Sequence, residues 1–342
     1  MSGNCCCADT CCVGTAEAST IPVVSTALLP KDILGACKVR WGFGRDNYMV
    51  DPGIYAVGKP DSSSPVLVSA NYKLTFDTVR KNLAGLDCWI LILDTKGVNV
   101  WCAAGKGTFG TDELVNRIEA VGLTEIVEHR ALIVPQLGAP GVSGYEVTRR
   151  TGFSVIFGPV RAGDIKDFIS AEYKATEEMR TVKFTFWDRL VLVPMELVEV
   201  LKISLSVFGV LFLINLFAAR SFGVQDFFIY MAAVVTGSVL TPILLPFIPG
   251  RALSFKGWIL GAISTVLLAY AFGWFSAPFL LLGIGYMLLL PAHSAFLALN
   301  FTGATTYTSF SGVIKEMKVA IPMIIISTVA GIVLILIKTF LG

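Results

Sequence analysis

The sequence has little charge for its length. Asp, Glu, Lys and Arg make up 15% of the 342 residues, whereas hydrophobic residues make up 54%; a soluble protein averages roughly 25% charged residues. The net charge is only +2, and no basic cluster alternates with aromatic side chains, which argues against a nucleic-acid binder. The length suits two domains. Because the hydrophobic residues concentrate after residue 190, they indicate membrane spans rather than a large soluble core.

The beginning of the chain lacks a positively charged segment followed by an apolar one. We therefore expect no signal peptide, and a soluble N-terminal half that stays in the cytoplasm. The eight cysteines show no spacing typical of a disulfide framework, which favours a reducing compartment. We expect residues 1–36 to form a disordered, cysteine-rich tail. Its cysteines are Cys5, Cys6, Cys7, Cys11 and Cys12.

Residues 37–172 alternate strand and helix signals. Short apolar runs predict buried strands at 66–69, 89–93, 98–101, 131–134 and 153–157. Helices are expected between them, one capped by Thr75 and ended by Gly85, one starting near Thr111 and one starting at Gly163. Strands separated by helices of this length indicate a parallel, Rossmann-like α/β sheet. Residues 37–60 are expected to be an irregular lead-in.

Residues 173–190 form a charged linker, and residues 191–342 an all-α transmembrane domain. Its five apolar stretches are 199–219, 227–248, 257–275, 278–299 and 319–341. Each has about the 20 residues that a helix needs to cross a bilayer core of about 30 Å. Gly257 and Gly261 are spaced for close helix packing. Arg251 and Lys315 lie in loops that would be inside, which predicts a multi-pass protein of the cell inner membrane with a cytoplasmic N-terminal domain.

The segment Asn-Val-Trp-Cys-Ala-Ala-Gly-Lys, residues 99–106, is the sharpest chemical feature. We expect a strand to end at Trp101, so that Cys102 stands where strand gives way to helix, a common ligand position on an open α/β sheet. The small residues 103–105 leave room for a flat group close to the backbone. A thiolate there would ligate a soft metal, and Lys106 would favour the thiolate. A plain buried cysteine is the alternative.

All eight residues of this segment match the cap-helix motif of the HgcA family, the mercury-methylating corrinoid proteins. The sequence resembles that family over nearly its whole length, including residues 51–58 (Asp-Pro-Gly-Ile-Tyr-Ala-Val-Gly), residues 69–77 and the five predicted spans. The soluble part is also similar to the corrinoid-binding domain of the corrinoid iron–sulfur protein of acetyl-CoA synthesis. That relative lacks both the cysteine and the spans.

The resemblance implies a corrinoid cofactor (cobalamin or another cobamide) whose cobalt has Cys102 as lower axial ligand. It implies methyl transfer from methyl-Co(III) to Hg(II), which gives methylmercury. The cofactor-binding residues that it implies are Thr75, Asp94, Thr95, Asn99, Val100, Trp101, Cys102, Ala103, Ala104, Gly105, Lys106, Gln136, Gly138, Ala139, Gly141, Val142 and Gly158. Simple turn chemistry would also explain the glycine-rich loop 136–144 and Gly158.

A thiolate ligand pushes electron density onto cobalt, which favours departure of the methyl group with its bonding electrons; a radical route stays open. The family implies a small ferredoxin with [4Fe–4S] clusters (HgcB type) as electron donor, and a methyl donor linked to methyltetrahydrofolate. Two alternatives are a membrane-bound corrinoid methyl carrier of one-carbon metabolism and a corrinoid-binding membrane transport or sensor protein.

Only two histidines are present, and neither lies in the Asp-x-His-x-x-Gly pattern of another B12-binding family. His293 falls in the fourth predicted span, where it is either functional or satisfied by an interhelical hydrogen bond. His129 is interpreted as structural. Adjacent thiolates suit Hg(II), so we hypothesise that the five N-terminal cysteines collect this ion. A dispensable tail, lipid-modified cysteines or a tail peculiar to this homologue are the alternatives.

Overall fold

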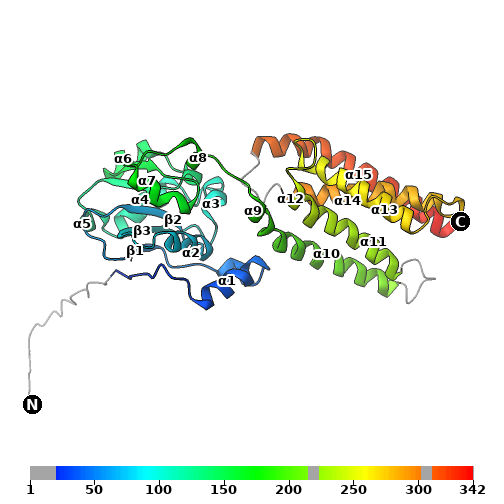
Figure 1. Cartoon of the computed structure of the whole chain (residues 1–342), viewed down its shortest axis with the longest axis horizontal. Coiled ribbons are helices and arrows are strands. Elements are labelled where there is room, and N and C mark those ends of the chain that lie inside the picture. The colour runs from blue at the N-terminus through cyan, green and yellow to red at the C-terminus, as the bar shows by residue number, and fades with distance from the viewer. Residues whose placement is uncertain (1–20, 215–222, 302–309, 342) are drawn as a thin grey trace, which may run out of the picture. The chain divides into compact units, whose positions relative to one another are not determined.

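The computed structural model describes residues 21–214, 223–301 and 310–341, and Figure 1 traces the chain. Residues 1–20 of the predicted tail, with its five cysteines, lie outside the described residues, whereas residues 21–36 are described and include the start of a helix at Pro30. The chain divides into two units. The α/β unit contains residues up to Leu28 together with Met49–Met179, and the helical unit contains Leu29–Tyr48 together with Arg180–Gly342. Residues 29–48 therefore group with the C-terminal helices and not with the sheet.

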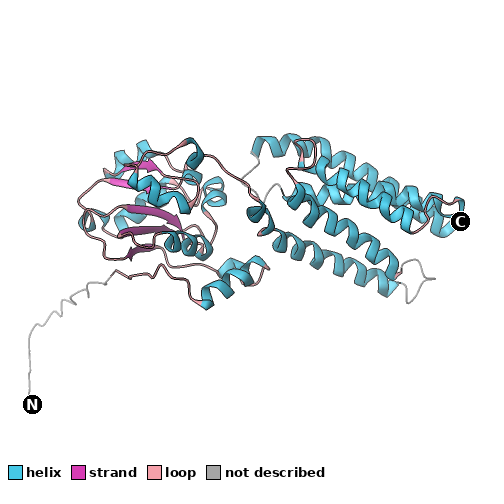
Figure 2. Cartoon of the chain, in the orientation of Figure 1, coloured by secondary structure: helices cyan, strands magenta, loops and turns pink. Residues whose placement is uncertain are grey.

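Within the described residues, five strands form one sheet in the α/β unit (Figure 2). The strands are β1 Gly53–Val57, β2 Val66–Ala70, β3 Cys88–Leu93, β4 Ala131–Val134 and β5 Ser154–Phe157. They lie in the order β1-β3-β2-β4-β5, and the runs predicted at 66–69, 89–93, 131–134 and 153–157 are confirmed. The prediction of a wholly parallel sheet is wrong, because β1 pairs antiparallel with β3. The sheet is therefore mixed. β1 lies in the predicted irregular lead-in.

The helices of the α/β unit differ from the sequence prediction in two respects. They are α2 Lys73–Asn82, α3 Val100–Lys106, α4 Thr111–Ala120, α5 Leu123–Ile126, α6 Gly144–Thr151 and α7 Ile165–Ser170, followed by α8 Glu177–Arg180 at the boundary of the unit. Thr75 is not a cap, because α2 begins two residues earlier and Thr75 lies in its first turn. The strand predicted at 98–101 is wrong, because the Asn99 side chain caps a helix that begins at Val100.

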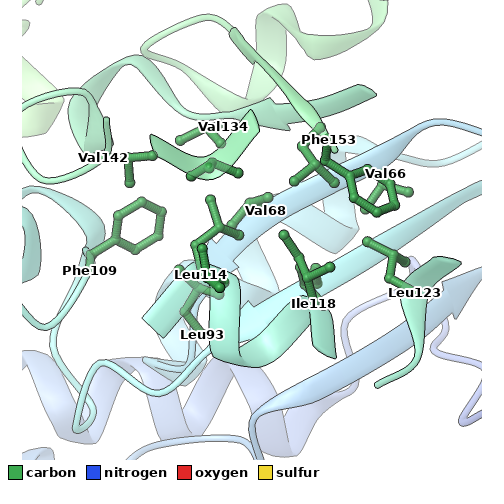
Figure 3. Packing of buried hydrophobic residues seen from close by; sticks show 14 of the residues in the cluster. Val66, Val68, Leu93, Phe109, Leu114, Ile118, Leu123, Val134, Val142 and Phe153 are labelled. Carbon is green, nitrogen blue, oxygen red and sulfur yellow. The ribbon is translucent and has the colours of Figure 1, made fainter. Parts of the chain in front are cut away.

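The core of the α/β unit lies on both faces of the sheet. Alternate residues of β2 face opposite sides: Val66 and Val68 pack with Phe109 and Leu114 on one side (Figure 3), and Leu67 packs on the other. β2 and β3 are buried along their whole length, as expected of central strands covered by helices on both faces. The faces are therefore filled by side chains, and the edges of the sheet are left for ligands.

The helical unit consists of α1 Pro30–Arg40, α9 Phe186–Leu190, α10 Val193–Ile214, α11 Val224–Val235, α12 Thr241–Leu244, α13 Leu253–Ala271, α14 Leu280–Asn300 and α15 Phe310–Leu341. Four helical stretches in the described residues are long and apolar enough to cross a membrane: 224–244, 253–271, 277–300 and 311–339. They correspond to the second to fifth predicted spans. α10 covers the first predicted span as far as Ile214, and residues 215–219 lie outside the described part. The count of five stays a prediction.

Small residues allow the long helices to approach closely. A Cβ on Gly261 of α13 would lie 2.8 Å from the Cα atom of Pro291 in α14, and one on Gly257 would lie 2.6 Å from the backbone oxygen of Ser294. Gly285 of α14 and Gly331 of α15 meet in the same way. The close packing predicted for Gly257 and Gly261 is confirmed, and it has the small-residue form typical of membrane helices.

Candidate functional site

The order of the parallel strands creates a place for a ligand at the carboxyl edge of the sheet. β2 lies between β3 and β4, so the chain leaves it toward one side and later returns to the other. Ligands of open α/β sheets bind outside the carboxyl ends of the strands at such a switch point. The segments after β2, β3, β4 and β5 carry almost all of the sequence-predicted site residues, which the topology therefore brings to one edge.

Helix α3 is held at this edge by a polar cap. The Oδ1 atom of Asn99 accepts a hydrogen bond of 2.9 Å from the backbone N–H of Cys102, and the left-handed Gly107 (φ 81°) ends the helix. Cys102 thus lies in the first turn of a helix and not at the end of a strand. The cap fixes the backbone of the residue that carries the thiol.

The two faces of α3 differ. Val100, Ala103 and Ala104 are buried in the core. Cys102 is half-buried, and Gly105 and Lys106 are exposed. Because residues three and four apart share a helix face, Cys102 lies beside Gly105 and Lys106 on the outer side.

Of the small residues predicted to make room for a flat group, only Gly105 has free space beside it. A Cβ on Gly105 would meet no atom within 4 Å. Ala103 and Ala104 instead let α3 pack against the sheet and the loop after β4. We refer to Trp101, Cys102, Gly105 and Lys106, the residues of α3 that are not buried, as the outer face of α3.

The glycine-rich loop after β4 packs on Phe109, which the sequence analysis missed. Phe109 is fully buried, and a Cβ on Gly138 would lie 2.5 Å from its ring. A Cβ on Gly141 would lie 2.1 Å from the Phe109 backbone oxygen and 3.1 Å from the Cα atom of Ala104. These glycines therefore admit Phe109 and α3. The aromatic residue between Gly107 and Gly110 was the available signal.

The other predicted residues of this edge have mixed surroundings. Gln136 and Ala139 are half-buried at the surface of the loop, and Val142 is buried in the core. A Cβ on Gly158 would lie 2.9 Å from the Ile133 side chain, so this glycine allows the end of β5 to lie close to β4. Gln136 and Ala139 therefore lie partly exposed at this edge, whereas Val142 is part of the core.

A second missed residue, Asn71, organises the turn between β3 and α3. Its side chain is buried, and its Oδ1 atom accepts hydrogen bonds from the backbone N–H groups of Thr95 (3.2 Å) and Gly97 (3.0 Å). Its Nδ2 atom donates to the Asp94 carboxylate at 3.2 Å. The Thr95 hydroxyl donates to the backbone oxygen of Val98 at 2.7 Å. Asn71 and Thr95 thereby fix the start of α3 relative to β2.

Asp94 is held as an anion in this turn. Its carboxylate accepts a hydrogen bond from the exposed Lys96, which holds the pKa of Asp94 below its usual range. Its backbone N–H donates to Glu113 at 2.8 Å, and Glu113 pairs with Arg117 at 2.7 Å. Since these bonds all lie within the turn and α4, the role of Asp94 that the structure describes is to position the loop. Thr75 is half-buried in the first turn of α2.

The cysteines of the α/β unit differ in access. Cys88 in β3 is fully buried, and burial, with the nearby Asp87, raises the pKa of its thiol to about 12. Cys102 reaches the surface on the outer face of α3. Among the described residues no group of three or more His, Cys, Asp or Glu side chains is placed to hold a metal ion. A metal at this edge would therefore need other ligands besides Cys102, such as those of a cofactor ring.

Comparison with known proteins supports a specific relationship for this unit. Residues 41–169 match the family model described as CO dehydrogenase/acetyl-CoA synthase delta subunit. The acetyl-CoA decarbonylase/synthase complex subunit gamma of Methanopyrus kandleri is 36% identical over 130 residues, which are 37% of this chain and 28% of that protein. Subunit gamma 2 of Methanosarcina thermophila is 37% identical over 118 residues, 33% of this chain and 25% of that protein.

The family model covers the sheet, α3 and the loop after β4. The chain spans only about a quarter of the length of the curated relatives that it matches. The similarity therefore concerns the α/β unit and its carboxyl edge.

Proposed function

We propose that the α/β unit binds a corrinoid at the carboxyl edge of its sheet, against the outer face of α3. One observation carries the proposal: the half-buried Cys102 lies on the same helix face as Gly105, beside which a Cβ would meet no atom within 4 Å. The similarity to acetyl-CoA decarbonylase/synthase subunits supports it, because the corrinoid iron–sulfur protein of acetyl-CoA synthesis has a corrinoid-binding domain of this kind.

Cys102 would be the lower ligand of the cobalt, since a thiolate is a good donor to a soft metal. Asn99 holds the backbone of Cys102, and Ala103 and Ala104 lock α3 onto the core, so the sulfur is presented from a rigid element. When bound, a corrinoid supplies a cobalt–carbon bond from which a methyl group is transferred. The outer residues Trp101 and Lys106 would border the ring.

Hg(II) is the methyl acceptor that we propose, with methylmercury as product. The cysteine is the feature by which this site departs from the corrinoid iron–sulfur protein, and its anionic sulfur favours transfer to an electrophile. Turnover needs an electron donor, for which we propose a small HgcB-type ferredoxin with [4Fe–4S] clusters, and a methyl donor linked to methyltetrahydrofolate. The four long apolar helices are compatible with a membrane protein.

The first experiment tests thiolate ligation. The full chain is purified in detergent, reconstituted with cobalamin, and its visible spectrum is recorded for wild type, Cys102→Ala and Cys88→Ser. We expect Cys102→Ala alone to shift the cobalt bands, because Cys88 is enclosed in β3. Coinciding spectra for wild type and Cys102→Ala would sink the proposed ligation and the mechanism built on it.

A second candidate function is that of a methyl carrier in one-carbon metabolism, which the similarity to acetyl-CoA decarbonylase/synthase subunits favours. The methylated, corrinoid-loaded protein is mixed with Hg(II), and methylmercury and loss of the methylated form are followed together. We expect methylmercury to form at the rate at which the methylated form disappears. A methylated form that is stable to Hg(II) would favour the carrier.

The proposal that the N-terminal cysteines deliver Hg(II) is tested separately. All five are replaced by serine, and methylation is measured at limiting Hg(II). We expect a lower rate at limiting Hg(II) and the wild-type rate at saturating Hg(II), because only capture is affected. An unchanged rate at limiting Hg(II) would show that the tail is dispensable.

A further inference from the structure

Helix α1 has two faces of different character. Its inner face carries the buried Asp32 and Val39, and Gly35 between them lets the ring of Tyr48 come close. The carboxylate of Asp32 also accepts a hydrogen bond of 3.0 Å from the backbone N–H of Leu29, at the start of the helix. The inner face therefore fixes how the helix is turned.

The outer face of α1 is apolar and exposed. Successive residues of a helix are turned by about 100° around its axis. Trp41, the C-cap residue, therefore lies about 180° from Asp32, on the opposite side of the helix. Leu34 and Cys37 lie on the same side as Trp41, within about 40° of it. Ile33 borders this stripe. Ile33 is 60% exposed and Leu34 is 56% exposed. Neighbouring exposed apolar side chains of this size are typical of a surface that binds a protein or a membrane.

Positive charge borders the stripe on both sides. Viewed down the helix axis, Lys31 and Lys38 lie next to Leu34 at one edge of the stripe. Arg40 lies next to Ile33 at the other edge. The single acidic residue of the helix, Asp32, points to the inner face. An apolar stripe with the exposed Lys31 and Lys38 along one edge suits a helix lying in a membrane interface, where long basic side chains reach the phosphates.

The turn after α1 contacts the start of one apolar helix, α10. α1 belongs to the helical unit. A Cβ on Gly42 would lie 3.8 Å from the Val198 side chain, and the Arg45 guanidinium contacts the sulfur of Met195. That end of α10 follows α9, whose Trp187 is 70% exposed. Aromatic side chains gather where membrane helices meet water.

We propose that residues 29–43 form an interfacial anchor. In it Ile33, Leu34, Trp41 and the 69%-exposed Phe43 insert into the headgroup layer, while Lys31 and Lys38 bind the phosphates of anionic lipids. A lipid surface explains both the apolar stripe and its basic borders, and it continues the surface that the neighbouring apolar helices require. The anchor is independent of the cofactor and of the methyl acceptor.

The test uses the full chain in lipid nanodiscs whose acyl chains carry bromine, a short-range quencher of indole fluorescence. The difference in emission between wild type and Trp41→Phe isolates Trp41. Tyr145→Trp is the matched control, because Tyr145 is an exposed aromatic residue of α6 in the α/β unit. We expect brominated lipid to remove most of the Trp41 emission and little of the emission from the indole added at position 145.

Charge is tested in the same discs with and without anionic lipid. We expect Trp41 to be quenched more strongly in anionic discs, and Lys31→Glu with Lys38→Glu to abolish this difference. Lys174→Glu, at an exposed site of the α/β unit, should leave it unchanged. A Trp41 signal no more quenched than the control at position 145 would overturn the anchor. Equal quenching in both lipids would overturn the role of the lysines.

Discussion

The α/β unit and the helical unit differ in where their large apolar side chains lie. In the α/β unit, large residues such as Ile90, Leu91 and Phe109 are wholly enclosed. In the helical unit, large residues such as Trp274 and Phe301 are also buried, but glycines lie at the closest helix contacts and many large apolar residues, such as Ile326 (69% exposed), face outward. We infer two meanings of exposure in this chain: contact with water in the α/β unit and, as the four long apolar helices allow, contact with lipid in the helical unit.

Removing the largest enclosed side chain at the site should have the largest effect. We expect Phe109→Ala to lower the free energy of unfolding by about 3–5 kcal/mol, because it leaves a cavity between α3 and the loop after β4. Chemical denaturation of the full chain in detergent, followed by circular dichroism, measures it. Tyr145→Ala, at an exposed site, is the control. A loss below about 1 kcal/mol would mean that Phe109 does not hold α3 in place.

The two meanings of exposure can be separated with one substitution. We expect Ile326→Asp, midway along α15, to cost about 3 kcal/mol of membrane insertion, because lipid cannot solvate the carboxylate. Tyr145→Asp should change stability little, because water can. The fraction of each variant recovered in the membrane measures the effect. Equal recovery of the two variants would break the comparison.

Close helix contact in the helical unit should be sensitive to added volume. We expect Gly261→Leu to lower stability by about 1–3 kcal/mol, because the new side chain must push α13 away from Pro291. Gly209→Leu in α10 is the matched control, since no atom lies within 4 Å of its Cβ position. Thermal unfolding in detergent measures both. Equal melting temperatures would show that this helix contact is loose.

The smallest effects are expected for two serine-to-alanine substitutions, which should change the free energy of unfolding in opposite directions. The buried Ser69 hydroxyl in β2 has no hydrogen-bond partner, so Ser69→Ala should raise the free energy of unfolding by about 1 kcal/mol. The Ser294 hydroxyl bonds the backbone oxygen of Ala233 at 3.0 Å, so Ser294→Ala should lower it by about 0.6 kcal/mol. Denaturation curves of both variants measure these changes. A loss of stability in Ser69→Ala would contradict the absence of a hydrogen-bond partner for the Ser69 hydroxyl.

Much of the sheet could be predicted because its central strands are continuous apolar runs. β1 was not predicted because Gly53–Val57 is short and lies among glycines and a proline, and its partner β3 is more than thirty residues further along the chain. The strand expected at 98–101 failed because the apolar residues Val98, Val100 and Trp101 outweighed the capping signal of Asn99, which decides the local structure. Local hydrophobicity identifies a buried segment but does not say whether it is strand or helix.

The site was predictable where it follows from strand ends and less so where it depends on tertiary contacts. Asp94 and Thr95 could be placed at the end of a strand because they directly follow the apolar run of β3, whereas Cys102 was placed by a strand at 98–101 that is a helix start. Asn71 and Phe109 could not, because the turn that Asn71 binds is more than twenty residues away and Phe109 meets glycines about thirty residues further on. The sequence predicted that residues 103–105 all leave room for a flat group. In the structure Ala103 and Ala104 pack in the core, and only Gly105 has free space beside it.

The helical unit is discontinuous in sequence, which has a consequence for synthesis. Arg45 and its contact Met195 are separated by 150 residues, so at about 5–20 residues per second the ribosome makes the second roughly 8–30 s after the first. The last strand of the sheet ends at Phe157 and is made within that interval. The α/β unit can therefore close on the nascent chain while α1, with its apolar stripe exposed, still waits for the helices that it joins.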